Sequence, residues 1–344
     1  MKFEWITDWD TIWSEPFQSR WREWIDKAEN THIFFHPEMV RVWIDTYFSL
    51  RELHPMFCVA YNENTTIFLP LILWKKNWKN AFMHTIIPAG YSDFDYHEPL
   101  LIGQTTDMIF FWTALLEECR LQNFQYDELL TDDIFNAIQN PLFQKQRNEL
   151  CPYIDLKNHQ TLEEYLNTLS KSSRKDLKRS ARILGENGTL RYEVLNTEEA
   201  LETLPIMIKT HQERYPNAYK APSFHENLIK YLLTKGLLHF SVLILENNII
   251  SWRIGFTFKE VYYSYMPVFD STYAKFAPSK VHLLLTIEDM LKRKYHTYDL
   301  MRGAKSYKNL FTDQTKEIYS YTVYSFSPTS RLKQWLQNAK STFK

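Results

Sequence analysis

Apolar positions along the chain follow two spacings, and the changes between them divide it into short helices and strands. A period near 3.6 residues predicts helices, and short alternating or apolar runs bounded by turn residues predict strands. In the first half these patterns predict helices over 9–26, 36–48 and 105–122 and strands over 56–61, 66–74, 82–88 and 127–130. In the second half they predict helices over 162–170, 173–184, 198–213, 224–234 and 280–295 and strands over 152–156, 191–195, 238–245, 249–258, 261–269, 297–302 and 317–326. A further amphipathic helix is expected after Ser327-Pro328.

The two halves have the same order of elements: helices, hairpin strands, a helix and a strand. Asn62-Glu63-Asn64 and Glu246-Asn247-Asn248 mark corresponding hairpin turns. Residues 131–149 are polar and lack a clear period, so we expect the boundary there. The pattern predicts an α+β chain of two similar domains, 1–149 and 150–344.

Composition narrows the class of protein. The 344 residues are 44% hydrophobic and 16% aromatic, which is typical of a globular chain. The net charge of -1 gives no general attraction to nucleic acid, so any anion site must be local. Cys58, Cys119 and Cys151 lack metal-ligand spacing and cannot all pair. With no signal peptide and no apolar run long enough for a transmembrane segment, we expect a cytoplasmic protein.

The most informative stretch is Asp299 to Lys308. It begins as a strand and breaks at Gly303, one of only 7 glycines, where we expect a positive φ or close approach of a ligand. Arg302, Tyr307 and Lys308 surround the turn. Upstream, a helix starts at Ala277-Pro278-Ser279-Lys280. A helix start of this kind can hold a phosphate group. The alternative is an ordinary capped helix N-terminus.

Four motifs in residues 165–325 resemble one family. They are Ser170-Lys171-Ser172-Ser173-Arg174-Lys175-Asp176-Leu177-Lys178-Arg179, His211-Gln212-Glu213-Arg214, Phe269-Asp270-x-x-Tyr273-x-x-Phe276-Ala277-Pro278-Ser279 and Asp299-Leu300-x-Arg302-Gly303-x-x-x-Tyr307-Lys308. In order and spacing this region resembles the GNAT-type acyltransferase domain of a group associated with cellulose and exopolysaccharide synthesis. That group is related to the Fem-type aminoacyl transferases of peptidoglycan synthesis. One departure is Ala277-Pro278-Ser279, where the family usually has Ser-Pro-Gly.

The resemblance implies tandem GNAT-like domains, each with a mixed, mostly antiparallel sheet flanked by helices. It also implies acyl-CoA as co-substrate, with its pyrophosphate at the N-terminus of the helix that begins at 277–280. Arg302, Gly303 and Lys308 are expected to complete the cofactor site. Tyr307 would protonate the departing thiolate.

Three of these side chains have a structural alternative. His211 is the candidate base for the acceptor, because histidine takes a proton near neutral pH, but it is also compatible with a helix histidine satisfied by a neighbour. Asp299 is a second candidate base, although an acid that holds Arg302 fits as well. Lys308 either contacts a phosphate or lies on a solvated loop.

Two further groups are candidates for acceptor binding. Six cations lie within residues 171–182, and of these Arg174, Lys175 and Lys178, with Arg214 on a later helix, are expected to bind an anionic acceptor. In the first domain, Asp93 and Asp95 lie in an acidic loop after Gly90 and are expected at the acceptor rim. A solvated helix and an exposed acidic loop are the alternatives.

Together these patterns predict a transferase that moves an acyl group, with acetyl the first choice, from acyl-CoA to an amine or hydroxyl of a sugar, nucleotide-sugar or glycan precursor. Fem-type transfer from aminoacyl-tRNA and a non-catalytic GNAT-like binding module are the alternatives, and tRNA is the one nucleic acid considered. G-x-S-x-G, Walker A and G-x-G-x-x-G motifs are absent from the sequence, as is any metal-ligand cluster.

Overall fold

The structure, a computed structural model, describes residues 1–75, 84–219, 221–303, 305–325 and 327–342, with side chains through Trp335. The chain divides into two compact units, the first formed by Met1–Glu149 with Glu317–Lys344 and the second by Leu150–Lys316. Residues 317–344, expected in the second domain, thus lie in the first unit.

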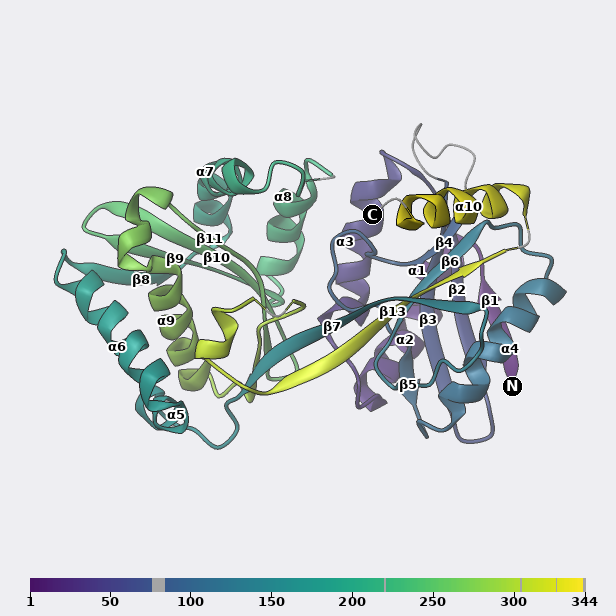
Figure 1. Cartoon of the computed structure of the whole chain (residues 1–344), viewed down its shortest axis with the longest axis horizontal. Coiled ribbons are helices and arrows are strands. Elements are labelled where there is room, and N and C mark those ends of the chain that lie inside the picture. Colours follow the sequence, from purple (N-terminus) through teal and green to yellow (C-terminus); the bar gives the residue numbers. More distant parts are fainter. Residues whose placement is uncertain (76–83, 220, 304, 326, 343–344) are drawn as a thin grey trace. The chain divides into compact units, whose positions relative to one another are not determined.

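The first unit is an α+β fold with one mixed sheet (Figure 1). Its strands are β1 (Lys2–Ile6), β2 (Glu52–Tyr61), β3 (Thr66–Lys75), β4 (His84–Pro88), β5 (Leu100–Ile102), β6 (Glu128–Asp133) and β13 (Thr315–Tyr324). Its helices are α1 (Trp9–Trp13), α2 (Glu15–Lys27), the short η1 (Ile33–Phe35), α3 (Pro37–Phe48), α4 (Asp107–Leu121) and α10 (Pro328–Thr342).

Strand pairing explains why the C-terminal segment belongs to the first unit. The sheet runs β1-β2-β3-β4-β6-β13, antiparallel except for the pair β4–β6. The last strand, β13, pairs with β6 from Tyr319↔Asp133 to Tyr324↔Glu128. The sequence pattern does not reveal that the C-terminal strand pairs with the first sheet, because a strand has the same pattern whichever strand it pairs with.

Alternating side chains of β2 divide the core of the first unit between the two faces of the sheet. Cys58 and Ala60 pack in one cluster with Phe111 and Trp112 of α4. On the opposite face, Phe57 meets Trp21 of α2, with ring centroids 5.5 Å apart. The period of two along the strand therefore gives each face its own covering helix.

The second unit repeats this plan. Its strands are the second part of β7 (Phe143–Asp155), β8 (Leu190–Val194), β9 (Leu238–Leu245), β10 (Asn248–Phe258), β11 (Val261–Phe269) and β12 (Thr297–Asp299). Its helical elements are α5 (Leu162–Thr168), α6 (Lys171–Gly185), α7 (Thr197–Arg214), α8 (Phe224–Leu228), η3 (Ile229–Leu233), η4 (Ser271–Phe276), α9 (Pro278–Lys292) and η5 (Lys308–Leu310).

The two sheets correspond strand for strand. The second runs β8-β9-β10-β11-β12-β7, with β11–β12 as the parallel pair, in the place that β4–β6 occupies in the first. Helix α9 connects β11 to β12 as α4 connects β4 to β6, although β5 also lies in the latter connection. In Figure 1, α5, α6 and α9 lie on one side of the second sheet and α7 and α8 on the other. The expected mixed, mostly antiparallel sheets flanked by helices are confirmed.

Several boundaries differ from the predicted ones. The helix expected over 9–26 is interrupted at Ser14, which is extended, and Pro16 occupies the first turn of α2 where no N–H is needed. Strands β1 and β5 were missed, as was the polar start of β7. Strand β12 ends at Asp299 rather than 302 because the chain turns there. The start of the strand expected over 82–88 lies outside the described residues, which resume at His84.

Candidate functional site

The parallel pairing of β11 with β12 ends before β11 does. The strands are in register from Val261↔Thr297 to Tyr263↔Asp299. Beyond that point β11 continues to Phe269, whereas β12 has ended. Backbone groups on β11 are thereby left beyond the last register pair, at the end of the sheet where the chain enters α9.

Two buried charges build the turn that follows β12. An oxygen of Asp299 accepts the backbone N–H of Met301 at 2.7 Å. The ammonium of Lys308 donates to the carbonyls of Met301 at 2.9 Å and Arg302 at 3.1 Å. Lys308 is only 4% exposed, so it is not the solvated lysine that one interpretation expected. The motif residues Asp299 and Lys308 thus hold the turn in shape.

Gly303 lies in this turn with φ +96°, which confirms the expected positive φ. No heavy atom within 4 Å would meet an added Cβ. Replacing Gly303 with alanine should therefore destabilise the protein by about 1 kcal/mol through backbone strain alone. Chemical denaturation would measure the loss. Gly185→Ala is the matched control, since Gly185 is helical and equally open, and it should be neutral or stabilising. Equal stability of Gly303→Ala and the wild type would refute the strain.

Helix α9 begins without a side-chain cap. Ala277 precedes it in the left-handed conformation, with φ +53°, and makes no side-chain capping hydrogen bond. Pro278 occupies the first turn. The first N–H groups of a helix with no capping side chain can donate to an anion. The nearby cation Lys280 is already engaged in an ion pair with Asp176 of α6 at 2.7 Å.

Arg253 of β10 lies beneath this helix start and was not predicted. Arg253 is 2% exposed, and its guanidinium donates to the Ser264 hydroxyl at 2.8 Å and to the Ser279 carbonyl at 3.4 Å. Burial opposes its charge, but the neighbouring tyrosines, Tyr298 foremost, leave the pKa of Arg253 above its ordinary value. Tyr307 is another of these neighbours, and it packs against the hydrophobic cluster that contains Tyr298. The one sequence signal was a cation inside an otherwise buried strand.

His211 lies near the C-terminal end of α7, within hydrogen-bond distance of a phenol. Its Nδ1 is 3.0 Å from the Tyr219 hydroxyl. Burial, followed by the charges of Lys305 and Arg214, lowers the pKa of His211 below its ordinary value. A histidine with a lowered pKa is neutral near pH 7 and can accept a proton.

The last turn of α7, the end of β11 and the Gly303 turn meet around this histidine. Arg214 lies over the rings of Tyr215 and Phe269, at 5.5 and 5.9 Å from their centroids. Lys305 lies 5.5 Å from the Tyr215 ring. The structure therefore brings His211 and Arg214 together with Lys305, which the sequence analysis missed although it lies two residues after Gly303.

Next to this group, His225 of α8 is buried against aromatic rings. Its ring lies 5.3 Å from that of Tyr219 and 6.0 Å from that of Tyr265. Burial, with a smaller contribution from His211, lowers the pKa of His225 to about 4. The unfolded chain, in which a histidine has a pKa near 6.5, therefore binds more protons between about pH 6.5 and pH 4.

Stability should accordingly fall as the pH drops from about 6.5 to about 4, by about 3 kcal/mol for this group. His225→Phe should remove that part of the dependence. Urea denaturation at several pH values would test this, with His54→Phe as the control at an exposed histidine. An unchanged pH profile in His225→Phe would contradict a buried, neutral His225.

The basic helix α6 covers α9 through Leu177, and its charges face several partners. Lys178 pairs with Glu163 at 2.8 Å, and Arg174 donates to Asn167 at 2.7 Å. Lys175 is exposed. Of the three α6 residues expected to bind an anionic acceptor, two therefore already contact a neighbour.

In the first unit, the Asp93 carboxylate already accepts hydrogen bonds from neighbouring side chains. Its carboxylate accepts from the Trp43 indole at 3.0 Å and from the Ser92 hydroxyl. Asp95 is half-buried. The acidic loop also contains two buried residues that were not singled out: His97 lies 3.2 Å from Asp132, and Glu98 lies 3.3 Å from His32.

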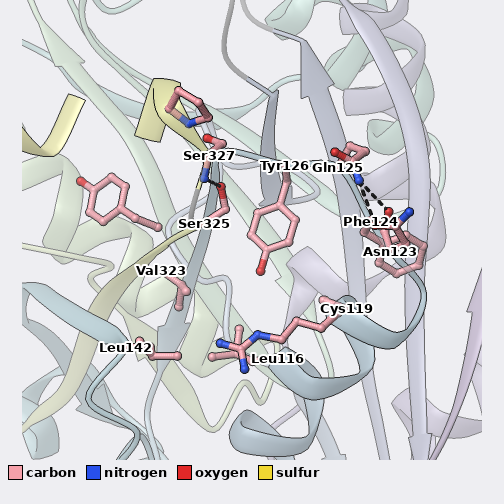
Figure 2. A pocket seen from close by; sticks show the side chains of 13 residues that line it. Leu116, Cys119, Asn123, Phe124, Gln125, Tyr126, Leu142, Val323, Ser325 and Ser327 are labelled. Carbon is pink, nitrogen blue, oxygen red and sulfur yellow. Dashed lines mark hydrogen bonds between the residues drawn. The ribbon is translucent and has the colours of Figure 1, made fainter. Parts of the chain in front are cut away.

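An open cavity of about 470 Å³ lies elsewhere in the first unit, at the C-terminal end of α4 (Figure 2). Leu116, Cys119, Tyr126 and Val323 are among its lining residues. It is at the opposite end of α4 from the position that corresponds to the start of α9, so it is not the counterpart of the α9 site.

Three further findings concern the chemistry available. Within the described ranges, no group of three or more His, Cys, Asp or Glu side chains could hold a metal ion. None of the helices described is long and apolar enough to cross a membrane. The three cysteines are buried, and none of them forms a disulfide.

Comparison with known proteins identifies the second unit. Residues 171–309 match a family model described as "Acetyltransferase (GNAT) domain". No curated protein sequence matches the chain.

Similar solved structures extend over both units. FemX has a TM-score of 0.61 at 10% identity, covering 96% of this chain and 99% of FemX. A conserved protein of unknown function from Bacteroides thetaiotaomicron VPI-5482 scores 0.57 at 9% identity, covering 94% of this chain and all of the other. A tandem GNAT protein from the clavulanic acid biosynthesis pathway scores 0.52 at 9% identity, covering 94% and 98%. At these identities the likeness shows the fold.

The GNAT domain match over residues 171–309 supports a GNAT-like acyltransferase. Across both units the chain has the α+β fold of tandem GNAT structures.

Proposed function

We propose that the chain transfers an acyl group, with acetyl as the first choice, from acyl-CoA to an amine or hydroxyl of a sugar, nucleotide-sugar or glycan precursor. The observation that carries this proposal is the parallel pair β11–β12, whose pairing ends at Asp299 while β11 continues to Phe269, ahead of the uncapped start of α9. The matched GNAT domain spans both features. The role in polysaccharide synthesis rests on the sequence resemblance alone.

In this proposal the N–H group of Ser279 donates to the pyrophosphate, and Ala277 and Pro278 shape the helix start. The side chain of Lys280, which pairs with Asp176, adds positive charge nearby. Arg302 supplies a further cation, while Gly303 and Lys308 keep the turn in place. The acceptor nitrogen or oxygen attacks the thioester carbonyl and forms the new bond to carbon as the carbon–sulfur bond breaks. His211 takes the acceptor proton, and Tyr307 gives a proton to the thiolate. Asp299 acts indirectly, by accepting the Met301 N–H and so holding the turn after β12 in shape.

Arg214, with Lys175 and the rest of α6, is proposed to attract an anionic acceptor, and Asp93 and Asp95 remain proposed acceptor contacts. The protein is proposed to act in the cytoplasm.

Aminoacyl transfer from aminoacyl-tRNA is the second candidate, favoured by the fold likeness to FemX and by the cations of α6. A non-catalytic module is the third, favoured by Ser279 in place of the family's glycine. A thiol assay separates the three. Because the protein's own cysteines are buried, release of CoA from acetyl-CoA should stand out against a low background.

Release that depends on an amino-sugar or nucleotide-sugar acceptor would support the proposal. Transfer from aminoacyl-tRNA with a steep salt dependence, and none from acetyl-CoA, would replace it by the second candidate. Activity with neither donor would favour the binding module.

A further inference from the structure

Helix α10 packs on the first unit through its polar side. Ser327 and Thr329 donate to the carboxylate of Asp127, and the fully buried Ser330 donates to the Asp127 carbonyl. One turn later, Lys333 pairs with the buried Glu128. Hydroxyl groups and an ion pair therefore fix this helix to the protein.

The apolar side of the described part of α10 faces solvent. Leu332 is 58% exposed and Trp335 is 65% exposed, and they lie three residues apart, on one face of the helix. The sequence continues this spacing with Leu336 and Ala339. A surface helix ordinarily buries its apolar stripe and exposes its polar one. Here the arrangement is reversed, which indicates that the apolar stripe meets something other than the core of this unit.

The charge of the segment identifies the occupant. Residues 328–344 contain Arg331, Lys333, Lys340 and Lys344 and no acidic residue, although the whole chain has a net charge of -1. A second copy of the chain would bring like charges against these cations, which opposes self-association through this helix. An amphipathic helix with exposed Trp and Leu beside lysines and arginines is suited to lie in the plane of an anionic lipid surface.

We propose that α10 docks the protein on the surface of an anionic phospholipid bilayer. Leu332 and Trp335 enter the boundary between headgroups and acyl chains, while the excess of cations in residues 328–344 attracts the lipid phosphates. The helix lies on the membrane and does not span it. Docking of this kind would bring the enzyme to lipid-linked acceptors, but it does not depend on the identity of the reaction.

Co-sedimentation of the full chain with sucrose-loaded vesicles tests the proposal. Vesicles of phosphatidylcholine with phosphatidylglycerol should bind the protein, and vesicles of phosphatidylcholine alone should bind it much less. Leu332→Ser with Trp335→Ser should abolish binding. Replacing Arg331, Lys340 and Lys344 with glutamine should weaken it by roughly fivefold for each cation lost. Phe110→Ser is the matched control, because Phe110 is an exposed aromatic residue of the same unit, on α4, with 68% exposure.

Three outcomes would overturn the proposal. One is that the wild type stays in the supernatant with anionic vesicles or binds neutral ones equally well. Another is that the Leu332/Trp335 variant binds as the wild type does, or that Phe110→Ser loses as much. The third is that light scattering shows a dimer that the Leu332/Trp335 variant breaks, without vesicle binding by the wild type. In that case the stripe contacts a second copy.

Discussion

Replacing His211 with alanine should lower kcat by about 10²- to 10⁴-fold and leave the KM for the acyl donor nearly unchanged. The acceptor must lose a proton as it attacks, and His211 is held neutral by burial and by the charges of Lys305 and Arg214. Because its pKa is lowered, the acidic limb of the pH–rate profile should lie below the range of an ordinary histidine. That limb should vanish in the variant. Steady-state kinetics across pH, at saturating donor, would measure both effects.

The neighbouring phenol supplies a sharper control. A base at Nε2 requires that Nδ1–H donate to the Tyr219 oxygen, which lies 3.0 Å away. Tyr219→Phe keeps the ring and removes that acceptor, so kcat should fall less than in His211→Ala while the donor KM stays constant. His54→Ala, at an exposed histidine of the first unit, should have no effect. Near-normal kcat in His211→Ala with the acidic limb intact would leave His211 a structural residue.

Replacing Lys308 with methionine should destabilise the second unit by about 3–5 kcal/mol. The buried ammonium donates to two backbone carbonyls, of Met301 and Arg302, and methionine would leave both without that donor. An exposed lysine that only contacted a phosphate would affect binding and contribute little to stability, whereas the burial of Lys308 predicts a large loss of stability. Chemical denaturation measures the free energy of unfolding. Titration of the folded variant with acetyl-CoA measures how far the altered turn weakens donor binding.

Lys175→Met is the matched control, since Lys175 is exposed on α6 and should contribute little to stability. If Lys308→Met were as stable as Lys175→Met, the ammonium would not hold the turn together. Lys308→Arg tests geometry, because a guanidinium keeps the charge but cannot place its donors as the ammonium does.

Much of the fold could be read from the sequence because its elements are amphipathic and short. The strands Leu238–Leu245 and Val261–Phe269 were predicted at their observed bounds, since each is a short run rich in strand-forming residues that ends at a turn. Strand β1 and the start of β7 were missed because neither shows a clear alternation of buried and exposed positions. The pairing of β13 with β6 depends on contacts between residues far apart in the chain, which local patterns do not encode.

The candidate site was read less completely, for a physical reason. Gly303 was found because a scarce glycine at a strand end points to a positive φ, which the structure has. Arg253 was missed because a cation inside a strand gives no sign of which neighbours it will meet. Lys308 was found but its burial was not, since burial of a lysine depends on carbonyls that the turn alone presents to it. The sequence motifs therefore located candidate site residues, but the groups that these residues contact are determined by the fold.

Direct binding of acetyl-CoA to the full chain is the measurement that tests the central claim most directly. Isothermal titration should show saturable binding with one site per chain, displaced by free CoA. A donor analogue without the pyrophosphate should bind much more weakly, because the start of α9 would lose the anion to which the Ser279 N–H is proposed to donate. Absence of any acetyl-CoA binding at millimolar concentration, by a folded protein, would contradict the acyl-CoA site at β11–β12 and with it the proposed reaction.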